Sequence, residues 1–128
     1  MRVLQLIDSL EAGGAERVAV NIANALSIKE NFESYLCTTR KEGLLKDSLD
    51  IKVGYLFLKK KSTFDFSSVK RLKKYIKNNE VDIIHAHSTS FFTAILVKRF
   101  YPKVKIVWHD HYGNSEFLNK RKFRVIKI

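Results

Sequence analysis

Cysteine and proline are almost absent from this sequence, since Cys37 and Pro102 are the only residues of either kind among 128. A single cysteine excludes an internal disulfide, and the apolar stretch around it predicts a buried, unreactive thiol. No run of residues is long and apolar enough to cross a bilayer, and the apolar stretch after Arg2 is too short for a signal peptide. These absences favour a protein of a reducing, cytoplasmic compartment.

The residues that are present suffice for one folded domain. With 45% hydrophobic and 12% aromatic residues, the composition is that of a globular protein and not of a disordered chain. A length of 128 residues allows one sizeable core. Nothing in the sequence marks an internal boundary, so we expect a single domain over residues 1–128.

Positive charge gathers in the second half of the chain. Residues 1–58 hold 7 Lys and Arg against 8 Asp and Glu, whereas residues 59–128 hold 17 against 5. Such an uneven distribution favours an acidic partner surface. The residues expected to form the basic surface lie on a predicted helix and are Lys70, Arg71, Lys73, Lys74 and Lys77.

Two interpretations of this charge stay open. Lysines with interleaved aromatic residues fit a surface that lies on an anionic membrane. They also fit solvated helix faces above an ordinary core. Nucleic acid is not favoured as a partner, because no helix-turn-helix, zinc-finger or RNA-binding signature is visible.

Strand and helix patterns alternate along the chain. Apolar runs predict strands at 2–7, 33–38, 51–58, 82–87 and 104–108. Helical spacing of apolar residues predicts helices at 14–28, 66–78, 89–99 and 114–127, with a short helical turn at 43–49. This alternation predicts an α/β fold, namely a Rossmann-like doubly wound parallel sheet of about five strands flanked by helices.

A glycine pair, Gly13-Gly14, stands between the first predicted strand and the first predicted helix. Residues without a Cβ let the backbone approach a ligand, and free N–H groups at a helix N-terminus favour negative charge. The pair fits neither the dinucleotide fingerprint nor a P-loop. A turn needed only for close packing is the alternative, but Asp8 and Ser9 stand at the strand end where open sheets bind ligands.

Two histidine pairs follow later strands at the same edge. His85 and His87 end the fourth predicted strand, and His109 and His111 end the fifth. Alternation along a strand places the two members of each pair on one face. Imidazole can donate, accept or take up a proton near pH 7, which suits a reactive site. One alternative is that these histidines are core residues whose hydrogen bonds are made within the protein. Another is a zinc or iron site completed by Asp110.

Three segments together resemble the N-terminal, acceptor-side domain of GT-B glycosyltransferases, specifically the retaining group called family 4. The loop 13–16, which reads GGAE, is similar to that family's glycine loop after its first strand. The segments 82–88, DIIHAHS, and 107–113, VWHDHYG, are similar to two of its later strand ends. The resemblance covers nearly the whole chain.

The resemblance implies roles for individual residues. His111 corresponds to the histidine that lies against the transferred sugar, so it is the expected catalytic residue. The expected substrate-binding residues are Gly13, Gly14, Glu16, His87, Ser88 and His109. Two departures affect the last segment, since His109 stands where the family often has Thr and Tyr112 separates His111 from the expected glycine.

The resemblance also implies a function. Such an enzyme transfers a sugar from a nucleotide-sugar donor to a polysaccharide or lipid-linked acceptor, with retention at the anomeric carbon and without a required metal or cofactor. A second Rossmann domain with an E-x7-E motif binds most of the donor in this family, and it is missing here, so we expect these residues alone to be inactive. The implied setting is cell-envelope synthesis in the cytoplasm, peripherally on the inner face of the membrane.

Two functions of other classes stay open. A small metal-dependent hydrolase would use the His85/His87 and His109/His111 pairs as metal ligands. A non-catalytic binding or regulatory Rossmann module would use the same sheet edge only to hold a ligand or a partner chain.

Overall fold

The computed structural model describes residues 1–62 and 65–110, together with the backbone of residues 123–126. Its elements in chain order are β1 (Arg2–Ser9), α1 (Gly14–Ser27), β2 (Glu33–Lys41), the 3-10 helix η1 (Leu44–Ser48), β3 (Gly54–Phe57), α2 (Phe66–Asn78), β4 (Ile83–His87), the 3-10 helix η2 (Ser88–Ser90), α3 (Phe91–Phe100), β5 (Lys105–His109) and β6 (Phe123–Ile126). Within the described residues, no helix is both long enough and apolar enough to span a membrane.

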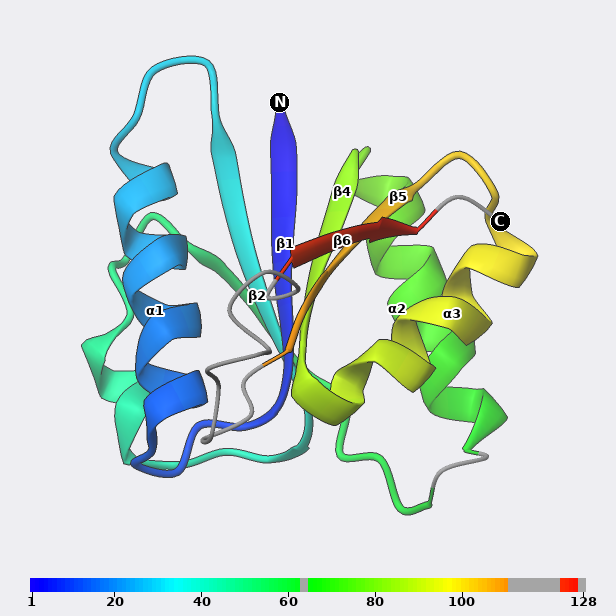
Figure 1. Cartoon of the computed structure of the whole chain (residues 1–128), viewed down its shortest axis with the longest axis horizontal. Helices are drawn as coiled ribbons and strands as arrows, with labels where there is room; N and C mark the ends of the chain where they lie inside the picture. Colours follow the sequence, from blue (N-terminus) through cyan, green and yellow to red (C-terminus); the bar gives the residue numbers. More distant parts are fainter. Residues whose placement is uncertain (63–64, 111–122, 127–128) are drawn as a thin grey trace.

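These elements form one sheet with helices on both faces. The strand order is β3-β2-β1-β4-β5-β6, and the first five strands are parallel. Helix α1 covers one face, whereas α2 and α3 cover the other (Figure 1). The predicted Rossmann-like α/β fold is therefore confirmed. Because the parallel strands end at a common edge, this arrangement brings the residues after β1, β2, β3, β4 and β5 together.

The C-terminal part of the chain corrects one prediction. A helix was expected over residues 114–127, but the backbone of Phe123–Ile126 forms β6, which pairs antiparallel with β5. Aromatic and β-branched residues favour a strand, and the sequence FRVI contains three of them. The strand pairing with β5 therefore overrides a weak helical pattern.

Strand β3 is shorter than its apolar run. Residues 51–53 were expected in the strand, but it begins at Gly54, and Ile51 is 98% exposed. The Asp50 carboxylate accepts a hydrogen bond from the backbone N–H of Lys52 at 2.9 Å. The Asp50 carbonyl oxygen also accepts one from the backbone N–H of Val53 at 3.0 Å. Such an Asx turn competes with strand pairing and delays the start of β3.

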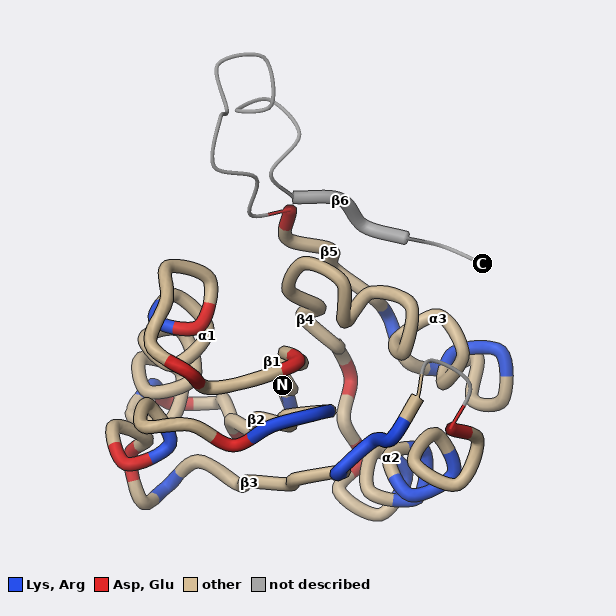
Figure 2. The backbone as a smooth tube through the Cα atoms, turned by 90° about the horizontal axis from the view of Figure 1, so that it is seen from below, with Lys and Arg blue, Asp and Glu red and all other residues tan. Residues whose placement is uncertain are grey.

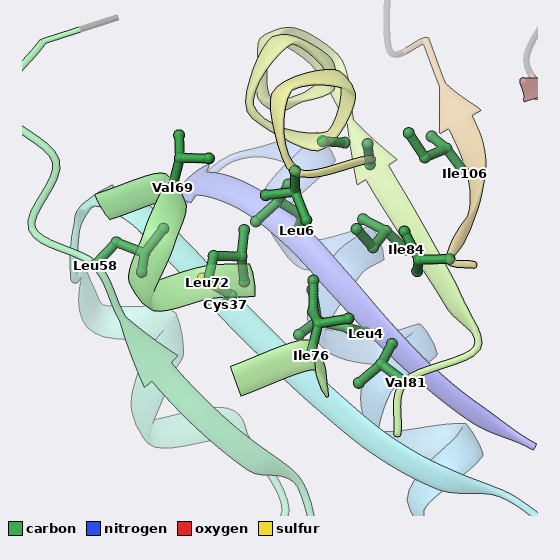
Figure 3. Packing of buried hydrophobic residues seen from close by; sticks show 14 residues of the cluster. Leu4, Leu6, Cys37, Leu58, Val69, Leu72, Ile76, Val81, Ile84 and Ile106 are labelled. Atoms are coloured by element: carbon green, nitrogen blue, oxygen red, sulfur yellow. The ribbon is translucent and has the colours of Figure 1, made fainter. Parts of the chain in front are cut away.

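The larger core lies between the sheet and α2 with α3. The apolar stripe of α2, formed by Val69, Leu72 and Ile76, packs toward residues of β1, β2 and β4 (Figure 3). Cys37 belongs to this core, as predicted. Burial raises the pKa of its thiol, because the apolar surroundings disfavour the thiolate.

A second core lies under α1. Its helix residues are Ala19, Val20 and Ala23, and they pack with Ile7 and Leu36 from the central strands. The two cores hold β1 from both faces, which fixes the position of its carboxyl end.

Candidate functional site

Three histidines form a stacked group where β4 and β5 end. His87 lies opposite His109 in the parallel register, and His85 lies two residues before His87 on the same face. The rings of His85 and His87 have centroids 4.2 Å apart, and each lies 5.4 Å from the ring of His109. All three side chains are buried. The prediction that His85 and His87 share a face is confirmed.

Gln5 fixes the orientation of one ring in this group. Its carbonyl oxygen accepts a hydrogen bond from Nε2 of His87 at 2.7 Å, which leaves Nδ1 of a neutral ring as an acceptor. One ligand atom from each of the three histidines lies within 4.8 Å of the others, so the group could hold a metal ion. His111, the expected catalytic residue, lies outside the described residues.

The glycine pair forms the start of α1. Gly13 is the N-cap residue and is extended, and neither glycine has a positive φ. A Cβ on Gly14 would have no described neighbour within 4 Å, and the atoms nearest to one on Gly13 would be those of the flexible Glu16 carboxyl group, at 2.6 Å. Close packing of helix and strand therefore does not require glycine here. The turn is exposed at the sheet edge, and Glu16 folds back beside it.

A different glycine is required by packing, and sequence reasoning missed it. A Cβ on Gly43 would lie 2.3 Å from the backbone nitrogen of Glu11 and 2.4 Å from the backbone of Leu10. The backbone N–H of Leu45 donates to the carbonyl oxygen of Leu10 at 3.0 Å, which holds the two segments together. Gly43 thus supports the chain that leads from β1 into the glycine turn.

The end of β4 has a restrained backbone. Ser88 is in the left-handed region with φ 54°, which is uncommon for a residue other than glycine. The indole Nε1 of Trp108 donates to its carbonyl oxygen at 3.1 Å. The hydroxyl of Ser90 donates to the carbonyl oxygens of Leu6 and His87 at 2.8 and 2.7 Å. These bonds hold His87 and Ser88 in place at the edge.

A pocket of about 740 Å³ opens at the same edge on the α3 side of the sheet, and we call it the α3 pocket. Its lining residues are Asp8, Arg40, Lys60, Thr89, Phe92, Ile95 and Leu96. The sequence signal for its polar members is their position just after predicted strands, and on that ground Asp8 is predicted at this edge. Among the residues that the structure describes, neither His85, His87 and His109 nor the two turn glycines belong to this lining.

Two threonines hold the acidic group of the α3 pocket. The hydroxyls of Thr39 and Thr89 each donate a short hydrogen bond to one oxygen of the Asp8 carboxylate. Lys60 also lines the pocket, and only 8% of its surface is exposed. Desolvation lowers the pKa of Lys60, and the nearby positive charge of Arg40 lowers it further.

The predicted basic surface forms a second hollow, of about 670 Å³, along α2, and we call it the α2 groove. It is lined by Lys70, Lys73, Lys74 and Lys77 together with Phe66, Val69, Asn78 and Phe100. Arg71 is not part of this lining, because its guanidinium donates to the carbonyl oxygen of Leu58 and to the Ser68 hydroxyl. Positive charge is concentrated on α2 and on the segment after β3 (Figure 2).

Comparison with known proteins identifies the family. A search of curated proteins found no match. The family model described as Glycosyltransferase Family 4 matches residues 12–127, which is most of the sequence. The match spans the glycine turn and the ends of both histidine strands. This chain belongs to glycosyltransferase family 4.

Proposed function

We propose that this chain is the acceptor-side half of an enzyme that transfers a hexose from a nucleotide sugar to a polysaccharide or lipid-linked acceptor. Membership of the family supports sugar transfer as the chemistry. The observation that carries the proposal is that one sheet edge collects the glycine turn, the histidine group and the α3 pocket. Open α/β sheets bind their ligands at this edge.

The edge residues have complementary roles in the proposal. Gly13 and Gly14 admit a sugar or diphosphate close to the first free N–H groups of α1, where positive dipole potential stabilises negative charge. The Glu16 carboxylate beside Gly13 is placed to accept hydrogen bonds from sugar hydroxyls. His87, Ser88 and His109 stand at strand ends on the acceptor side of the edge, where the side chains of His87 and His109 are buried and Ser88 is half-buried.

Catalysis in this proposal belongs to His111. It contacts the donor sugar and stabilises the transition state of a reaction that proceeds with retention and without a required metal. Most of the donor nucleotide is bound by a second Rossmann domain, which supplies the remaining positive groups for the leaving diphosphate. The 128 residues alone are therefore proposed to be inactive.

The direct experiment compares wild type and His111→Ala in the presence of the donor-binding domain, with nucleotide-sugar consumption as the readout. We expect turnover to fall about 100-fold, as when a single transition-state donor is removed, while circular dichroism stays unchanged. Unchanged turnover would remove His111 from the mechanism. Robust transfer by residues 1–128 alone would show that no second domain is needed.

The α2 groove is proposed to hold the enzyme at the inner face of the cell membrane, where cell-envelope acceptors are found. Its lysines can meet anionic headgroups, while Phe66 and Phe100, 55% and 57% exposed, can enter the acyl boundary. Flotation with vesicles should show binding that rises with anionic lipid and falls with salt. Failure to float at low salt would show that the lysines of α2 form an ordinary solvent-exposed surface without a role in membrane binding.

A further inference from the structure

We propose that the α3 pocket binds the phosphate ester of a long-chain alcohol, with Arg40 and Lys60 on the phosphate and α3 along the hydrocarbon. This inference rests on the proposed function in so far as it makes that ester the lipid part of the acceptor. The volume of the α3 pocket, about 740 Å³, is within the range of small-molecule sites. The two halves of its lining differ in chemistry, which is what an amphiphilic ligand requires.

The polar half of the pocket carries positive charge that no acidic side chain neutralises directly. Among the described residues, neither Arg40 nor Lys60 forms an ion pair within 4 Å. To the described residues, the Lys60 ammonium donates one hydrogen bond, to the Thr93 hydroxyl at 2.9 Å. An ammonium has three donors, so two stay available for an anion.

Main-chain contacts hold Lys60 at this position. Its backbone N–H donates to the carbonyl oxygen of Thr39 at 2.6 Å, which extends the pairing of β3 with β2. Lys59, just before it, is in the left-handed region with φ 52°. A sharp backbone bend therefore turns this lysine toward the sheet edge, whereas its neighbours Lys59 and Lys61 are exposed. Figure 2 shows the positive segments at the end of β2 and after β3 at this edge.

Among the described residues, the acidic residue of the pocket forms no ion pair with these cations, because its oxygens are hydrogen-bonded elsewhere. Both oxygens of the Asp8 carboxylate accept hydrogen bonds from threonine hydroxyls, Thr39 on one side and Thr89 on the other. Asp65, the other carboxylate that acts on Lys60, accepts from the backbone N–H groups of Lys61 and Ser68 at 3.1 and 3.2 Å. Of the described lining residues, Asp8, Arg40 and Lys60 carry charge, and together they are net positive.

The apolar half of the pocket favours an anion that carries a hydrocarbon chain over a small inorganic anion. Phe92 is 61% exposed, and Ile95 and Leu96 are half-buried beside it on α3. Inorganic phosphate would leave this apolar surface in water, whereas a hydrocarbon chain would bury it. The last residue of α3, Phe100, lines the α2 groove. One helix thus leads from the pocket to the surface proposed to meet the membrane.

The test is a binding titration on the 128-residue chain with farnesyl phosphate below its aggregation concentration. Farnesol and inorganic phosphate are titrated in parallel as the apolar and the anionic parts alone. We expect saturable binding of farnesyl phosphate, with each of the two parts binding at least tenfold more weakly. Equal binding of farnesol would leave no role for the cations, and equal binding of phosphate would leave none for α3. Either result overturns the proposal.

Variants assign the binding to this pocket. Lys60→Met keeps the length of the buried side chain and removes its charge, and Arg40→Gln removes the second charge. Each should raise the dissociation constant at least tenfold, with melting midpoints measured to confirm folding. Lys103→Gln is the matched control, because the exposed Lys103 lines neither the α3 pocket nor the α2 groove, and it should leave the constant unchanged. An equal loss in all three variants would show unspecific charge attraction and overturn the site.

This titration is independent of sugar transfer. Specific binding of farnesyl phosphate without transfer in the complete enzyme would reject the proposed function but keep the pocket. Transfer to acceptors without a lipid phosphate, together with no binding here, would keep the function and reject the pocket.

Discussion

The indole Nε1 of Trp108 donates a hydrogen bond to the carbonyl oxygen of Ser88 at 3.1 Å, so β5 holds the end of β4 in its left-handed turn. The Trp108 ring also stacks on Phe91 at a centroid distance of 4.7 Å. One side chain thus links β5, the turn after β4 and the start of α3, and it fixes the backbone next to His87.

Trp108→Phe should show how much the hydrogen bond contributes to stability apart from the ring stacking. Phenylalanine keeps an aromatic ring against Phe91 but leaves the Ser88 carbonyl without its indole donor, which should cost about 1 kcal/mol of unfolding free energy. Urea denaturation followed by circular dichroism measures this loss. Phe91→Leu is the comparison, because it weakens the stack and keeps the bond. No change in Trp108→Phe would mean that the bond does not restrain the turn.

Gly43→Ala should destabilise the chain by about 2–3 kcal/mol, because the new methyl group would overlap the backbone of Leu10 and Glu11. The matched variant is Gly14→Ala, whose methyl group has no described neighbour within 4 Å. Its stability should equal or exceed that of wild type, since alanine favours a helix more than glycine does. Thermal unfolding of both variants checks the contrast, and equal midpoints would contradict it.

Asp65 should make stability depend on pH in the acidic range. Hydrogen bonds from the backbone N–H groups of Lys61 and Ser68 lower the pKa of this carboxyl below its usual 3.8. The stabilisation by the charged form is therefore fully present above pH 3.8 and lost as the pH falls through the lowered value. Asp65→Asn keeps an N-cap for α2 and removes the charge.

The measurement for this prediction is the melting midpoint of wild type and Asp65→Asn between pH 2 and neutral pH. The two proteins should differ above pH 3.8 and converge at the acidic end. Asp65→Ala, which removes the cap as well, should stay below wild type at every pH. A constant difference between wild type and Asp65→Asn over the whole range would show that the carboxylate charge has no part.

The histidine group allows the metal-dependent hydrolase to be tested against sugar transfer. If sugar transfer needs no metal, exhaustive treatment with a chelator should leave the transfer rate unchanged. A hydrolase using His85, His87 and His109 would carry metal at one ion per chain and lose its activity on chelation. Metal analysis of the purified protein, followed by chelation, distinguishes the two.

The elements that could be predicted from the sequence are those in which the local sequence pattern favours the same structure as the packing in the folded protein. Helix α2 has the predicted bounds, because Val69, Leu72 and Ile76 recur at helical spacing and Asp65 caps its start. The carboxyl-edge position of the histidines followed from the parallel topology. The pairing of His87 with His109, however, is a register that only the folded sheet defines.

The parts that were missed depend on contacts between distant residues. Arg40 and Lys60 belong to one pocket because β2 and β3 are neighbours, and nothing in either local sequence marks them as a pair. Gly43 is required by the backbone of Leu10, which lies more than 30 residues earlier in the chain. The residues of β6 were assigned to a helix because apolar and basic residues alternate there in a pattern that also fits helical spacing.

The proposed function requires substrate to approach the backbone at the turn that opens α1. The most direct measurement is kcat/KM for sugar transfer by Gly14→Ala, with the donor-binding domain present. We predict a loss of roughly tenfold or more, because a methyl group at this exposed turn displaces the substrate, together with a melting midpoint at or above that of wild type. An unchanged kcat/KM in the folded variant would contradict the account.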